Sequence, residues 1–195
     1  MNPLAAAAFG IVLAASAGLR AFLPVFSASL AIRVFDIPLP EHLAWMGATE
    51  TLLLFGVATV LEILGDKIPF VDHLLDSVQT VVKPAMAVLA ATPFLHDLTP
   101  GYGLALGIIM GAPLALGVHS AKASARLGSS ALTAGTANPF LSLIEDVVAI
   151  GIIAVTFVAP FVALALVTIC IAWLVRLAAR RRSRRRGGAA TARQI

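Results

Sequence analysis

Four carboxylates surround a proline break in an otherwise apolar chain: Glu62, Asp66, Asp72 and Asp76. Residues four apart share one face of a helix, so we expect Glu62 to pair with Asp66, and Asp72 with Asp76. Carboxylate oxygens suit a hard divalent cation. They could instead carry protons, because two close negative charges favour protonation of one of them. A structural alternative is that Asp66 caps the helix that follows and that Lys67 neutralises a neighbour.

A basic stripe is formed by His119, Lys122 and Arg126, whose spacings of three and four place them on one helical face. Arginine offers a bidentate fork and lysine a point charge, so the stripe suits a phosphate or another anionic group. The alternatives are a helix end among lipid phosphates, or counter-ions for Glu145 and Asp146.

A third group begins at Asn138, which precedes Pro139 in the pattern of a helix start. The free amides of such a start can bind an anion. Glu145 and Asp146 are adjacent and point in different helical directions. We therefore expect one of them to pair with a base of the stripe and the other to face a cavity.

Arg20 lies deep in an uncharged stretch, four residues before the helix-breaking Pro24, and must meet an acid or a phosphate. The complete set holds the six acids already named and five bases, Arg20, Lys67, Lys83, Lys122 and Arg126. This near balance predicts a mutually paired internal network. Either the charges of this network pair only with one another, or the network leaves a gap in which a solute binds.

The elements around these residues must be membrane helices. Only 12% of the 195 residues are charged and the mean hydropathy is +0.96. A charge at bilayer depth costs about 2.5–3.5 kcal/mol, so it is retained only when it is paired or used. The single Cys170 excludes a disulfide framework and a thiolate metal site. No phosphate-binding glycine loop, nucleophile elbow or zinc-protease motif occurs.

The apolar stretches predict an all-α, polytopic transmembrane helix bundle of about six spans. They cover residues 4–34, 43–65, 70–91, 102–118 and 140–175. Pro24 breaks the first stretch into two shorter pieces, and Pro160 divides the last. Five spans result if the last stretch is one long kinked helix. Six spans place both termini on the same side of the membrane.

Two further features concern packing. The stretch 70–91 is too polar to face lipid, so we expect it to be enclosed by other helices, re-entrant or interfacial. The spacing of Gly103, Gly107 and Gly111 favours close helix contact.

Each half of the chain has a base in its first helix and acids in its second, which is compatible with a 3+3 inverted repeat.

Eight of the fourteen Lys and Arg residues lie from Arg176 onward, which leaves the body with six bases and ten acids. We expect a membrane domain over residues 1–178 and a disordered, Arg-rich tail over 179–195. The tail predicts a cytoplasmic C-terminus that contacts anionic lipid headgroups, and no nucleic-acid partner. A homo-oligomer is left open.

Several motifs together resemble a family of bacterial membrane proteins known as domain of unknown function 4126. They are Gly18-Leu19-Arg20-Ala21-Phe22-Leu23-Pro24, Glu62 with Asp66-Lys67-Ile68-Pro69 and Asp72-His73, Lys83-Pro84, His119 with Lys122 and Arg126, and Asn138-Pro139 with Glu145-Asp146. The resemblance covers about residues 4–160. It implies an integral inner-membrane protein and supplies no activity.

We expect a small transporter or permease-like protein with a charged intramembrane cavity for an ion, an anionic solute or a lipid. Arg20, Lys122 and Arg126 would hold the anion, and the acidic cluster would bind a coupling proton or divalent cation. The alternatives are a metal-dependent enzyme acting on lipid phosphates, and a non-catalytic membrane subunit whose charges are structural. We favour transport over catalysis, and the sequence requires no cofactor.

Overall fold

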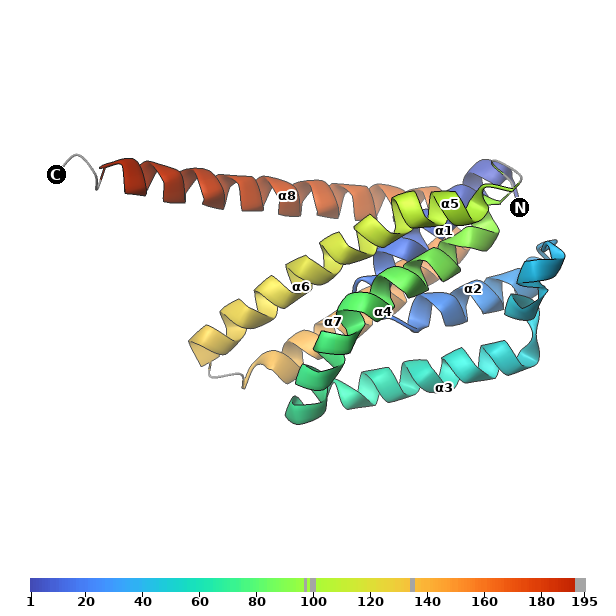
Figure 1. Cartoon of the computed structure of the whole chain (residues 1–195), viewed down its shortest axis with the longest axis horizontal. Coiled ribbons are helices and arrows are strands. Elements are labelled where there is room, and N and C mark those ends of the chain that lie inside the picture. The colour runs from blue at the N-terminus through green and yellow to red at the C-terminus, as the bar shows by residue number, and fades with distance from the viewer. Residues whose placement is uncertain (97, 99–100, 134–135, 192–195) are drawn as a thin grey trace.

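The structure is a computed structural model that describes the backbone of residues 1–96, 98, 101–133 and 136–191. Of these residues, the side chains of 69–74, 76, 174, 177–178 and 180–191 are not described. The helices are α1 (Pro3–Ala17), α2 (Leu23–Val34), η1 (Glu41–Gly47), α3 (Thr49–Gly65), α4 (Pro69–Leu95), α5 (Gly103–Leu106), η2 (Gly107–Gly111), α6 (Ala112–Thr133), α7 (Asn138–Val158) and α8 (Pro160–Thr191). The described part contains no strand, and its helices form an elongated bundle (Figure 1).

Three helices of the described part are long and apolar enough to cross a membrane: Ser77–Leu95 within α4, Gly103–Thr133 across α5, η2 and α6, and α7. The pair η1 and α3 makes a fourth candidate, bent by 57°. Pro3–Ala17, Leu23–Val34 and Pro160–Trp173 are shorter than the ~20 residues that a crossing needs. The helices therefore indicate a membrane protein with three or four candidate spans, and the predicted six spans and inverted repeat are not confirmed.

The first apolar stretch forms two helices, as Pro24 predicts, but the break lies at residues 18–22. The Gly18 amide closes α1 by bonding to Ala15, and Pro24 occupies the first turn of α2. α2 runs back beside α1, so the ring of Phe35 reaches that of Phe9 with centroids 6.2 Å apart. The N-terminus and the far end of α8 lie at opposite ends of the molecule (Figure 1). The side of the membrane on which each terminus lies stays a prediction.

α4 is the central helix of the bundle and contacts α1, α2, α3, α5, η2 and α6. Its polar residues Gln79 and Lys83 are buried, as are Ala87 and Ala91 farther along. Of the arrangements expected for this polar stretch, enclosure by other helices is thus seen for this one face, whereas Val78 and Val81 are 53% and 75% exposed.

The predicted close approach at the small-residue stripe is confirmed. A Cβ at Gly107 would lie 2.9 Å from Oγ1 of Thr92, and one at Gly103 would lie 3.0 Å from Cα of His96. At Gly111 the nearest atom would be the Ala87 carbonyl oxygen at 3.3 Å. These glycines let α5 and η2 lie directly against α4.

Pro160 starts a new helix instead of kinking a long one. α7 ends at Val158, Ala159 is extended enough to leave the helical region, and α8 returns along the bundle (Figure 1). The buried residues Ala163 and Val167 of α8 pack on Val12 of α1. α8 continues as helix to Thr191, which lies in the segment that the sequence predicts to be the Arg-rich tail. The side chains of 180–191, and the whole of 192–195, are not among the described parts of the structure.

Candidate functional site

The centre of the charged network is Arg20, which lies in the α1–α2 break and whose side chain is fully buried. Its Nη1 contacts Asp66 Oδ2, and its Nη2 forms an ion pair with Asp146 Oδ1. The same Nη2 donates to Oγ of Ser142 at 3.1 Å and to the Ser142 carbonyl at 3.3 Å. The guanidinium thus connects the α1–α2 break to α7 and to the end of α3. Its buried positive charge is paired with two carboxylates, as the sequence predicts for a buried arginine.

Asp66 receives three cations at a single oxygen. Besides Arg20, Arg126 Nη2 lies 3.4 Å and Lys122 Nζ 3.6 Å from Oδ2. Asp66 follows the last residue of α3, and the residue before α4 is Ile68. The alternative of Asp66 as the cap of the next helix is therefore wrong.

The adjacent acids of α7 serve different bases, as predicted. Oε2 of Glu145 lies 3.0 Å from Lys122 Nζ and 3.0 Å from Arg126 Nη2. Asp146 Oδ2 lies 2.6 Å from Lys67 Nζ, in addition to the contact with Arg20. The acid that pairs with the basic stripe, Glu145, is also the one that lines a cavity.

The basic stripe of α6 faces inward, and its three residues are 5–7% exposed. It is therefore not a helix end among lipid phosphates. His119 Nδ1 lies 3.1 Å from Lys83 Nζ, and its Nε2 lies 3.4 Å from Thr80 Oγ1. Since an ammonium only donates, Nδ1 of His119 accepts in this contact.

Glu62 does not share a site with Asp66, contrary to the pairing expected from their spacing. Its carboxylate accepts hydrogen bonds from the amides of Ala21 at 2.7 Å and Phe22 at 3.1 Å, where α2 begins. Gln79 Nε2 donates to it at 2.9 Å. The two acids lie four positions apart on one helical face, but each accepts hydrogen bonds from a different set of donors.

A divalent cation at the acidic cluster stays a prediction. Among the described side chains, no three His, Cys, Asp or Glu residues gather as metal ligands. The side chains of Asp72 and Asp76 lie outside the described residues.

Asn138 is placed differently from the expectation. α7 begins at Asn138, the residue before it is Ala137, and no side chain caps the helix. Nδ2 of Asn138 donates instead to Oγ of Ser130 on α6, at 3.0 Å. Its role in the described structure is to tie the start of α7 to α6.

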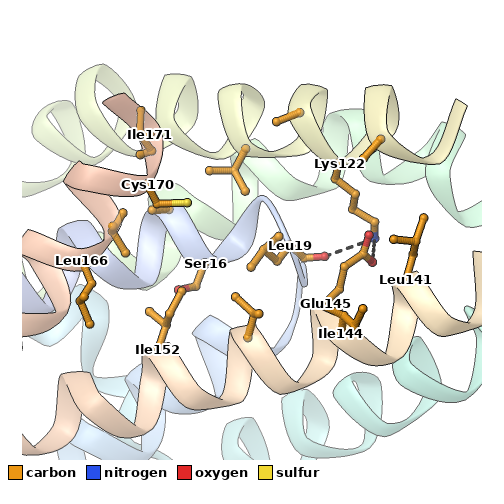
Figure 2. Close-up of a pocket in the computed structure, with 16 residues that line it drawn as sticks. Ser16, Leu19, Lys122, Leu141, Ile144, Glu145, Ile152, Leu166, Cys170 and Ile171 are labelled. Atoms are coloured by element: carbon orange, nitrogen blue, oxygen red, sulfur yellow. Dashed lines mark hydrogen bonds and ion pairs between the residues drawn. The ribbon is translucent and has the colours of Figure 1, made fainter. Parts of the chain in front are cut away.

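A cavity of about 430 Å³ adjoins the network, between α1, α6, α7 and α8. Figure 2 shows Lys122 and Glu145 meeting at one end of it and Cys170 facing it from α8. Its remaining lining is apolar apart from Ser16, whose hydroxyl donates to the Val12 carbonyl.

Two residues of the network, Gln79 and Ser142, were not predicted from the sequence, which placed Lys83 among the network's bases without giving it a binding role. A helical spacing signal existed for each. Ser142 lies four residues before Asp146, and Gln79 lies four residues before Lys83, which places each pair on one face. Polar residues at these spacings from a buried charge are the expected donors and acceptors of such a network.

Comparison with known families gives one match: a family model described as "Domain of unknown function (DUF4126)" matches residues 7–180. No curated protein and no solved structure is significantly similar to the chain.

Proposed function

The chain belongs to the family Domain of unknown function (DUF4126), and because that description assigns no activity, we propose from the site itself that it is a small membrane transport protein. The substrate is an ion or an anionic solute, which passes the buried network at the α1–α2 break. We place it in a bacterial inner membrane with the C-terminus in the cytoplasm.

The observation that carries this proposal is the burial of so many charges at a break between two short helices. Arg20 is fully buried between Asp66 and Asp146, whose side chains are 1% and 8% exposed. A purely structural contact at this place would be served as well by apolar side chains, because buried ion pairs rarely increase stability over such replacements. Charges kept at this depth are a mark of substrate and ion pathways.

The helix break itself supports the same function. Discontinuous helices whose free N-termini bind anionic groups are a recurring plan of transporter sites. Here the amides of Ala21 and Phe22 open α2, and the carboxylate of Glu62 occupies them. In the proposed cycle a substrate anion replaces Glu62, whose release changes the packing of α2 against α3.

The network also has one side that is partly exposed. The side chain of Lys67 is 34% exposed, whereas those of Arg20, Lys122 and Arg126 are 0–6% exposed. Lys67 binds Asp146. An ion entering along Lys67 would therefore reach the carboxylate that holds Arg20.

The test is flux through reconstituted protein. Proteoliposomes are given gradients of protons, sodium, potassium, chloride or phosphate, and decay of each gradient is compared with that in protein-free vesicles. Glu62→Gln is expected to slow the transported species by about tenfold or more, equivalent to about 1.4 kcal/mol on the barrier.

The matched control is Glu50→Gln, because Glu50 is an exposed acid in the first turn of the same helix. It is expected to leave the rate unchanged. Wild-type flux equal to that of empty vesicles for every ion would contradict the proposal and leave the charges with a structural role. An activity on lipid phosphates that vanishes with chelator would instead favour the enzyme.

A further inference from the structure

The cavity beside the network has the shape and lining of a ligand site. Its volume of about 430 Å³ falls within the ~300–1,000 Å³ of small-molecule pockets. Residues such as Ala121, Leu141 and Ile152 make apolar walls, and Lys122 and Glu145 are its charged lining residues (Figure 2). Its occupant must therefore be largely hydrocarbon, with a polar group at one end.

The charges at that end favour an anion. Lys122 Nζ divides its contacts among Glu145 at 3.0 Å, the Leu19 carbonyl at 3.4 Å and Asp66 at 3.6 Å. Glu145 is bound at the same time by Arg126, which does not line the cavity. Lys122 can therefore turn to an incoming anion while Glu145 keeps a cation, so no buried charge is left uncompensated.

The cavity lies where bilayer hydrocarbon can reach it. Two of its walls, α6 and α7, belong to candidate membrane spans. At its margin Ile144 is 59% exposed and Leu166 is 52% exposed. In a membrane protein such apolar surfaces face lipid tails, so a chain can enter from the side without crossing water.

We propose that this cavity binds one acyl chain of an anionic phospholipid whose phosphate contacts Lys122. The phosphate is the chemistry that Lys122 selects, and the apolar walls assign it to a lipid instead of a free anion. The site adjoins the proposed transport site but does not depend on it.

Cys170 makes the proposal measurable, because this single cysteine of the chain lines the cavity. Cys170 is exposed, so alkylation of the full-length protein by N-ethylmaleimide in nonionic detergent reports whether a ligand in the cavity covers its thiol. Dioleoyl phosphatidylglycerol at ten times its half-protecting concentration is expected to slow alkylation by about tenfold. Dioleoyl phosphatidylcholine should protect only at much higher concentration, and inorganic phosphate should not protect.

Three variants localise the effect. Lys122→Gln is expected to erase the difference between the two lipids, whereas Arg33→Gln, an exposed base outside the cavity, should retain it. Ala121→Phe fills the cavity and should slow alkylation without any lipid. Thermal unfolding of each variant confirms that it is folded before alkylation is compared.

The wild-type protein alone can overturn the proposal. Both lipids carry a phosphate, so equal protection by them would overturn the preference for an anionic headgroup. Protection by inorganic phosphate would make the site one for a free anion, and no protection would leave the cavity without a lipid. Since none of these measurements uses flux, a failed transport assay leaves the lipid site standing, and the converse also holds.

Discussion

Glu145 and Asp146 are neighbours in α7, yet the cations that they bind come from different halves of the chain. Glu145 contacts Lys122 and Arg126 of α6, at 3.0 Å each. Asp146 contacts Arg20 in the α1–α2 break and a lysine that follows α3. Two successive residues of one helix therefore connect the second half of the bundle to the first.

The two acids should differ in their contribution to stability. Asp146→Asn leaves Arg20 and Lys67 buried or half-buried with fewer negative charges, so we expect it to lower the free energy of unfolding by about 3–5 kcal/mol. Glu145→Gln should cost less, because both bases of α6 also contact Asp66. Unfolding in detergent at a series of denaturant concentrations measures both. An equal or larger loss for Glu145→Gln would contradict the assignment of their contacts.

Arg20 and Asp66 should be strongly coupled in stability. Among the described residues, the variant Arg20→Met leaves Asp66 with only Lys122 and Arg126 as ion-pair partners, and Asp66→Asn leaves Arg20 with only Asp146. The double variant removes both partners of the contact. We expect the double variant to be less destabilised than the sum of the single variants by about 1–3 kcal/mol. A cycle of Asp66→Asn with Arg33→Met, whose base bonds to Thr49 at 3.0 Å, serves as the control and should be additive. Additivity in both cycles would show that the Arg20 contact is not formed.

Gly18 should tolerate no side chain. A Cβ there would lie 2.5 Å from both the Ala115 carbonyl oxygen and Val118 Cβ, so α1 and α6 would have to separate. We expect Gly18→Ala to lower the free energy of unfolding by about 1–3 kcal/mol. The control is Gly117→Ala, where nothing lies within 4 Å and helix propensity predicts a gain of up to about 1 kcal/mol. Similar losses at the two positions would contradict the close contact of α1 with α6.

The termini should lie on opposite sides of the membrane. The N-terminus and the far end of α8 occupy opposite ends of the bundle (Figure 1). Reporter domains fused to the two ends, one active only inside the cell and one only outside, measure this directly. We expect the C-terminal fusion to report the cytoplasm and the N-terminal fusion the other side. Two fusions on the same side would restore the arrangement expected from six spans.

The members of the network were largely predictable from the sequence, but their pairings were not. A charge in an apolar stretch must find a partner, so Arg20, Lys122 and Glu145 could be singled out without a structure. Which acid meets which base depends on how helices pack side by side, and nothing local encodes it. The expected pairing of Glu62 with Asp66 shows the limit: their spacing places them on one face, but the amides that Glu62 binds belong to the distant α1–α2 break.

The predicted number of spans is not confirmed, for a related reason. Hydropathy measures how apolar a stretch is and not where the chain reverses. Residues 4–34 are predominantly apolar apart from Arg20 and Arg33, and a Pro marks a break, but only tertiary packing sends α2 back beside α1. Asn138 likewise has the residue type of a helix cap. Its side-chain amide instead donates a hydrogen bond to the hydroxyl of Ser130.

The position of Arg20 has a consequence for how the protein is made. Ser142, its partner on α7, is 122 residues farther along the chain, which corresponds to about 6–24 s at synthesis rates of about 5–20 residues per second. During that interval the α1–α2 hairpin carries an arginine that lacks the α7 partners, so its final insertion must wait for α7. Chains truncated before α7 are therefore expected to remain extractable or to be degraded faster than the full-length protein, which pulse labelling of nested truncations would measure. Full assembly is thus delayed until the last quarter of translation.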